Sequence, residues 1–175
     1  LLSIARHFDH GFLSDGFDGL TRLLINIIVA SDITGIMKGT SAVINLSDEN
    51  SNKQILKSNI AQNVVLNKEN LGEASPTSLL GTIALIRQTL LDAQWLSNAK
   101  KIYAKNPAQP RPENNETLES LENVITRKQQ IIFETNDEQN FLRAAKIAKE
   151  FSLNPIIVGS GYEYRRINEI KETNI

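Results

Sequence analysis

The stretch from residue 129 to residue 170 constrains the fold more than any other part of the chain. Two short, continuous apolar runs, at 130–134 and 155–158, are typical of strands that are buried on both faces. An amphipathic helix is expected after each run, and Asn136 with Gln139 is predicted to cap the first one. The order strand, helix, strand, helix indicates parallel strands that are joined by right-handed crossovers.

The rest of the chain is expected to continue this alternation. The longest helix is predicted to begin near Pro76, with Ser75 as its N-cap. Its buried face is expected to include Leu80, Leu91 and Trp95, because they fall among regularly spaced apolar residues. The predicted fold class is therefore α/β, with parallel strands alternating with helices. Further parallel strands are expected at 23–30, 41–46 and 63–67, and a second helix at 116–127.

Charge and composition narrow the function classes. The net charge is −1, with 19 Lys and Arg against 20 Asp and Glu, so no basic surface for nucleic acid is expected. The longest apolar run, at 23–30, is too short to span a membrane. We therefore expect a soluble protein of the cytoplasm or the periplasm, and since the chain does not begin with Met, we expect a fragment or a trimmed product.

The ends of the last two predicted strands hold the candidate site. In parallel α/β sheets, functional groups gather where strands end and helices begin. Here those points are Glu134 with Thr135, and the turn Gly159-Ser160-Gly161. Glu134 is the candidate catalytic residue of this set. Thr135 and the turn suit substrate binding, because glycines let the backbone approach a ligand closely.

His7 and His10, with Asp9 between them, form a second candidate for metal binding if this segment is helical. The glycines that follow them favour a surface segment instead.

Four segments carry a family resemblance. Their order and spacing resemble the imidazolonepropionase-like branch of the amidohydrolase superfamily over residues 21–173. The resemblance implies a bacterial enzyme with a (β/α)8 barrel, in which a divalent, zinc-type metal activates water to hydrolyse an amide, cyclic amide or peptide-like C–N bond. Because such barrels run to about 250 residues, residues 21–175 are expected to form a partial barrel as one domain, with residues 1–20 as an unmatched segment. The four segments are SDITGIMKGTSAVINL, NVVLNKEN, PTSLLGTIALIRQTLLDAQW and IIFETNDEQNFLRAAKIAKEFSLNPIIVGSGYEY.

The chain departs from the family at its metal ligands. The His-x-His pair that follows the first barrel strand in the family is missing here. Glu134 stands where the family has one metal-binding histidine, and the turn 159–161 stands where it has another. The resemblance thus implies Glu134 as a metal ligand or proton acceptor. A lone carboxylate at a strand end is also commonly a solvated residue or the partner of a helix dipole. The isolated chain is expected to be inactive, because a catalytic zinc normally needs three protein ligands.

Two other function classes stay open. One is a small anion-binding domain, in which the turn 159–161 holds a phosphate or carboxylate at a helix N-terminus. The other is a non-catalytic α/β unit with a structural or interaction role. An incomplete barrel leaves strand edges without partners, so a homo-oligomer is expected in either case.

Overall fold

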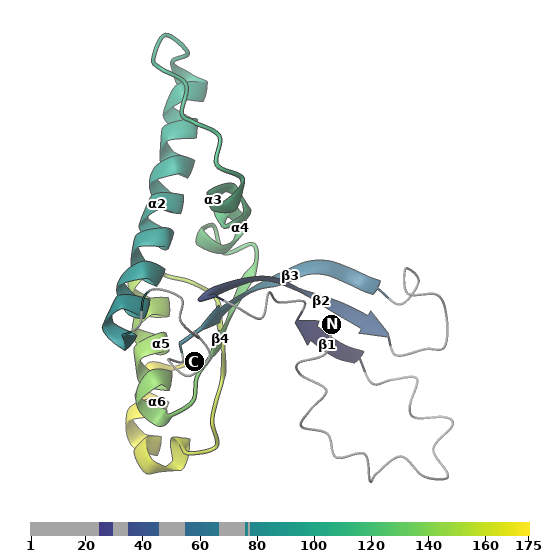
Figure 1. The fold of residues 1–175 in the computed structure, drawn as a ribbon, viewed down its shortest axis with the longest axis vertical. Helices are drawn as coiled ribbons and strands as arrows, with labels where there is room; N and C mark the ends of the chain where they lie inside the picture. Colours follow the sequence, from purple (N-terminus) through teal and green to yellow (C-terminus); the bar gives the residue numbers. More distant parts are fainter. Residues whose placement is uncertain (1–24, 30–34, 46–54, 67–75, 77) are drawn as a thin grey trace.

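A five-stranded mixed sheet forms the centre of the molecule (Figure 1). The computed structural model describes residues 25–29, 35–45, 55–66, 76 and 78–175. The pairs β1–β2 and β2–β3 are antiparallel, whereas β3–β4 and β4–β5 are parallel. The strands, in their order across the sheet, are β1 (Ile25–Val29), β2 (Met37–Asn45), β3 (Ile55–Val65), β4 (Gln130–Glu134) and β5 (Pro155–Val158).

The orientation of the first strands differs from the prediction. We expected every strand to be parallel, but β1, β2 and β3 form an antiparallel meander. The reason is that the connections 30–36 and 46–54 are short, whereas a parallel pair needs a crossover of a dozen or more residues. From β3 onward, the predicted alternation of parallel strands with helices is confirmed.

The helices begin close to the predicted positions, with different capping residues. The longest helix, α2, starts at Leu79, and the Ser78 hydroxyl oxygen accepts from the Gly81 N–H at 3.1 Å. Helix α5 is capped by Asp137 rather than Asn136, with the Asn140 N–H donating to Asp137 at 2.6 Å. The predicted helix 116–127 is divided into two short helices. The helical elements are α2 (Leu79–Lys105), α3 (Glu116–Ser120), α4 (Glu122–Ile125), α5 (Glu138–Glu150), the 3-10 helix η3 (Glu163–Arg166) and α6 (Ile167–Thr173).

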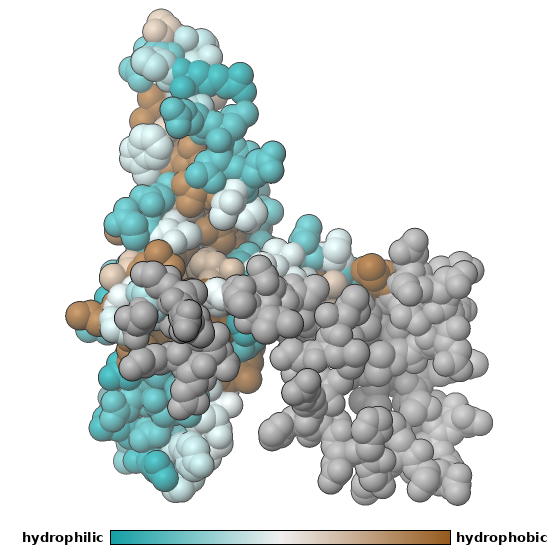
Figure 2. Space-filling model, in the orientation of Figure 1, coloured by the Kyte–Doolittle hydropathy of each residue, from teal (hydrophilic) through white to brown (hydrophobic). Residues whose placement is uncertain are grey.

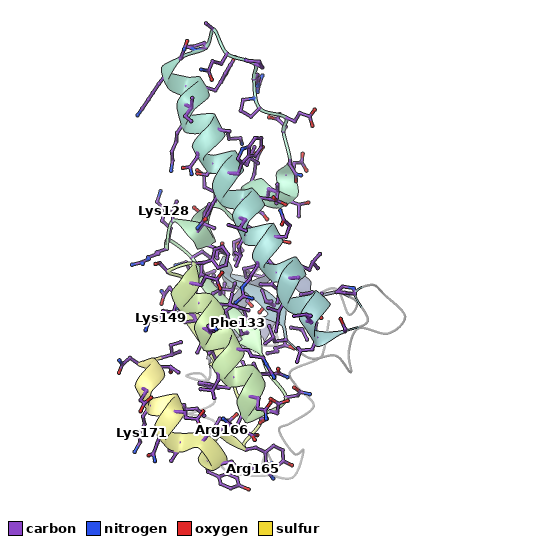
Figure 3. The ribbon with its side chains drawn as sticks, turned by 90° about the vertical axis from the view of Figure 1, so that its left-hand side faces the viewer. Lys128, Phe133, Lys149, Arg165, Arg166 and Lys171 are labelled. Carbon is purple, nitrogen blue, oxygen red and sulfur yellow. The ribbon has the colours of Figure 1, made fainter. Side chains whose placement is uncertain are left out.

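The hydrophobic core lies between the helices and one face of the sheet. Alternate residues of β3 and β4, including Val64 and Phe133, point toward the helices and are fully buried. Ile86 and Leu90 of α2 and Ile147 of α5 belong to the same buried cluster. Figure 3 shows Phe133 beside α5, with the labelled Lys128, Lys149 and Lys171 at the edge of the molecule.

The outer side of α2 carries apolar side chains that we expected to be buried. Leu80, Leu91 and Trp95 are 78%, 50% and 66% exposed. They lie on the side of the helix away from Ile86 and Leu90, and apolar surface is visible along α2 in Figure 2. The apolar pattern of α2 is wider than the face that the sheet can cover, so the pattern alone did not separate the two sides.

The opposite face of the sheet, which we call the open face, is the one that the core helices do not cover; it is exposed at β5, whereas Val65 on β3 is fully buried. In-register neighbours of parallel strands share a face, which places Val65, Glu134 and Val158 in one row across it. Ile156 and Val158 on β5 are 37% and 49% exposed. The open face is therefore apolar at β5 and carries a carboxylate at the end of β4.

Within the described ranges, no helix combines the length and the apolar composition that crossing a bilayer requires.

Candidate functional site

Glu134 is the last residue of β4 and lies on the open face at the carboxyl end of the parallel strands. Its backbone is fixed by the sheet, because its carbonyl accepts from the Leu66 N–H at 2.9 Å. Its side chain is 31% exposed and has Val65 and Val158 as in-register neighbours. The predicted carboxylate is thus held by a rigid strand between two valines, with access to solvent.

The partner of this carboxylate is Lys38, which the sequence did not single out as a site residue. The Lys38 Nζ lies 3.4 Å from Glu134 Oε2, and the lysine side chain is only 10% exposed. The register of β2 against β3 runs from Met37 opposite Val64 to Gly39 opposite Asn63, so Lys38 is the extra residue of a β-bulge. Bulges are frequent beside active sites, where they redirect a side chain.

Buried polar groups hold this bulge in place. The Asn63 amide donates to the Gly39 carbonyl at 3.1 Å, and the Ser41 hydroxyl donates to Asn63 Oδ1 at 2.9 Å. Ser41 and Asn63 are both fully buried. Gly39 has a φ of 84°, a conformation that costs glycine little and other residues more. Gly39, with Gly35 four residues before it, was therefore the available sequence signal for a bulge.

Thr135 joins the ends of β4 and β5. Both its backbone N–H and its hydroxyl donate to the Val158 carbonyl, at 3.1 Å and 2.9 Å. Thr135 is 9% exposed, so its described contacts are within the protein. These hydrogen bonds hold the ends of β4 and β5 together, so that Glu134 and Gly159 of the predicted site lie at neighbouring strand ends.

The turn 159–161 already surrounds an anionic group, which is the chain's own Glu163. The Ser160 N–H and hydroxyl donate to Glu163 Oε1 at 2.6 Å and 3.3 Å. A Cβ on Gly159 would stand 2.5 Å from that oxygen, so glycine leaves the space that the carboxylate fills. Gly161 has a φ of 88°, which explains the second glycine.

The pKa of Glu163 reflects this environment. Desolvation raises the pKa, but the backbone N–H groups of Glu163, Ser160 and Gly161 and the Ser160 hydroxyl together lower it below its ordinary value of 4.5. Hydrogen bonds to the charged form favour that form. The anion that we expected at this turn is thus supplied by a residue three positions downstream.

The described residues do not by themselves fit a divalent metal. Across these parts of the chain, no three His, Cys, Asp or Glu side chains lie close enough together to hold an ion. Glu134 is a single carboxylate, and one of its oxygens faces the Lys38 ammonium. A catalytic zinc takes three protein ligands, so any further ligands would come from residues beyond those described. His7 and His10 lie outside the described residues.

The chain matches no protein-family model and no curated protein. Its structure is similar to the crystal structure of an amidohydrolase from Thermotoga maritima MSB8, with a TM-score of 0.66 and 22% sequence identity. The match covers 75% of this chain and 35% of that one, so the chain spans about a third of the length of that protein. The two share a fold, and the unit from β3 to α6 fits part of a (β/α)8 barrel.

Proposed function

We propose that this chain is one section of the barrel of a metal-dependent amidohydrolase of the imidazolonepropionase-like branch. The proposed reaction is hydrolysis of an amide, cyclic amide or peptide-like C–N bond. The fold shared with an amidohydrolase supports the class. The observation that carries the proposal is the position of Glu134, at the carboxyl end of a parallel strand on the face away from the helices. In barrels built this way, that end of the strands holds the active site.

Glu134 is proposed as the proton acceptor. A water molecule forms a bond to the carbonyl carbon, and Glu134 takes the proton that the water loses. The tetrahedral intermediate then breaks its C–N bond, and the proton passes to the departing nitrogen. Thr135 and the turn 159–161 lie at the neighbouring strand ends and are proposed to line the substrate site, with their described hydrogen bonds to Val158 and Glu163 fixing its shape. The divalent metal that the sequence resemblance implies would bind in the whole enzyme, with ligands that the described residues do not supply.

Assays of the full-length protein test this proposal. A panel of N-acyl amino acids, five- and six-membered cyclic amides and dipeptides would be screened for amine or carboxylate release. At least one class should be hydrolysed by the full-length protein, whereas the 175-residue chain alone should be inactive. If no panel member is hydrolysed with divalent metals supplied, the proposed reaction is wrong.

The alternative of a non-catalytic interaction unit has one observation in its favour. Leu80, Leu91 and Trp95 expose apolar surface on the outer side of α2, away from the core side chains of this helix. Contiguous exposed apolar surface is typical of a protein contact. An inactive full-length protein that binds a partner through α2 would favour this alternative.

A further inference from the structure

We propose that Lys38 is a positioning residue for Glu134, and that the bulge in β2 aims its ammonium group at the carboxylate. This inference rests on the proposed role of Glu134 as proton acceptor. It adds a residue from a different part of the chain, 96 positions away, to a site that otherwise consists of strand ends.

The first support is the distance that Lys38 has to cover. Strands β2 and β4 are not neighbours, because β3 lies between them. Since adjacent strands are about 4.8 Å apart, the side chain must extend across a whole strand to meet Glu134. A long side chain can do this only from the open face. The bulge at Lys38 supplies the extra residue that directs it there.

The second support is burial. The Lys38 side chain is 10% exposed, although lysine is among the residues that are most rarely buried. Withdrawing an ammonium group from water is unfavourable unless it meets an opposite charge. Among the described residues, the charge that meets it is Glu134. The placement of this lysine is therefore explained by the carboxylate.

The third support is the rigidity of the bulge. Ser41 and Asn63 are fully buried, and their hydrogen bonds end on the Gly39 carbonyl, one residue beyond Lys38. Groups that position a catalytic side chain act well only when their own conformation is fixed by packing and hydrogen bonds. Here the fixed element is the backbone on which Lys38 is mounted.

The functional consequence concerns the direction of the carboxylate. One oxygen of Glu134, Oε2, faces Lys38, which leaves Oε1 to receive a proton from water. Proton transfer requires the acceptor within hydrogen-bond reach of the donor, so a carboxylate that turns freely would spend less time in a productive orientation. Lys38 therefore affects the rate of the chemical step and not the binding of substrate.

A double-mutant cycle in the full-length protein tests this role. The variants are Lys38→Met, Lys38→Arg, Glu134→Gln and the double variant Lys38→Met with Glu134→Gln. Lys100→Met is the matched control, because it removes another lysine–glutamate ion pair, Lys100 with Glu119 at 2.7 Å, on the helical side. The readouts are kcat and KM on a hydrolysed member of the panel, with circular dichroism to confirm folding.

Lys38→Met should lower kcat about 100-fold, the size of effect expected when a reacting group is displaced by about 1 Å, and should leave KM unchanged. Lys38→Arg should recover most of the loss. In the Glu134→Gln background, Lys38→Met should cause no further loss, because Lys38 acts through Glu134. The double variant has no unpaired buried charge. Its kcat can therefore be compared with that of Glu134→Gln even if Lys38→Met alone fails to fold. Lys100→Met should match the wild type.

Other outcomes separate the two proposals. A normal kcat in Lys38→Met, with Glu134→Gln inactive, would overturn the role of Lys38 while the proposed function stands. A further fall in the double variant, or a rise in KM alone, would also overturn it, because Lys38 would then act on the substrate directly. Full activity in Glu134→Gln would instead remove the proposed function of Glu134.

Discussion

Glu134 ends strand β4, whereas Glu163 begins the 3-10 helix η3, and their hydrogen-bonding partners distinguish them. Glu134 meets one ammonium group from another strand and remains partly open to solvent. Glu163 binds the N–H groups of the turn that precedes it. A carboxylate that accepts hydrogen bonds from neighbouring backbone N–H groups is suited to stabilising a turn. A carboxylate that is partly exposed to solvent is suited to accepting a proton from water.

Glu163 should therefore contribute stability that depends on pH. Its pKa in the folded protein is below the ordinary value of 4.5, so the contribution is complete above that pH and is lost as pH falls through the lowered pKa. Glu163→Gln should reduce the free energy of unfolding at neutral pH, and the difference from the wild type should narrow at about pH 3. Urea unfolding at both pH values measures this. A difference that is the same at both would contradict it.

At the scale of secondary structure, the apolar pattern predicted where the last strands lie, but it did not predict the strand orientation or the capping residues. The strands 130–134 and 155–158 were predictable to the residue, because each is a short apolar run bounded by polar turn formers. The antiparallel meander was missed because the periodicity of a strand does not show its direction. The short connections between these strands did indicate antiparallel pairing. Lys38 and Glu134 are adjacent only through the register of three strands, which no local pattern records.

The two sides of α2 can be compared with adjacent leucines. Leu90 is fully buried in the core, and Leu91 is 50% exposed. Leu90→Ala should lower the free energy of unfolding by about 2–5 kcal/mol through the cavity it leaves. Leu91→Ala should cost less than about 1 kcal/mol, because little packing is lost. Urea denaturation of both variants measures these losses of unfolding free energy. Equal losses would contradict the orientation of α2 against the sheet.

At the scale of the whole molecule, the sheet ends at β5, and its open face is apolar there. Ile156 and Val158 are partly exposed, and β5 pairs with β4 on one side in the described sheet. In a complete barrel, a further strand would cover that edge. The family resemblance pointed to this incomplete architecture, and the match to about a third of an amidohydrolase supports it.

The isolated chain is predicted to form a dimer or a larger homo-oligomer. Unpaired strand edges and exposed apolar side chains favour association between copies. Light scattering at micromolar concentration should show more than one copy, and replacing Ile156 and Val158 with Ser should reduce the association. A monomer in the unmodified chain would contradict this prediction.

The most direct test of the central claim is the turnover of Glu134→Gln compared with Glu150→Gln in the full-length protein. Both variants remove one carboxylate from an ion pair, but Glu150 pairs with Arg87 on the helical side of the molecule. Glutamine cannot accept the proton, but its amide oxygen can still accept a hydrogen bond from the Lys38 ammonium. Glu134→Gln should therefore lower kcat about 10²–10⁴-fold with the fold intact, while Glu150→Gln keeps the turnover of the wild type. Near-equal turnover in the two variants would show that Glu134 is a strand-end residue without a catalytic role.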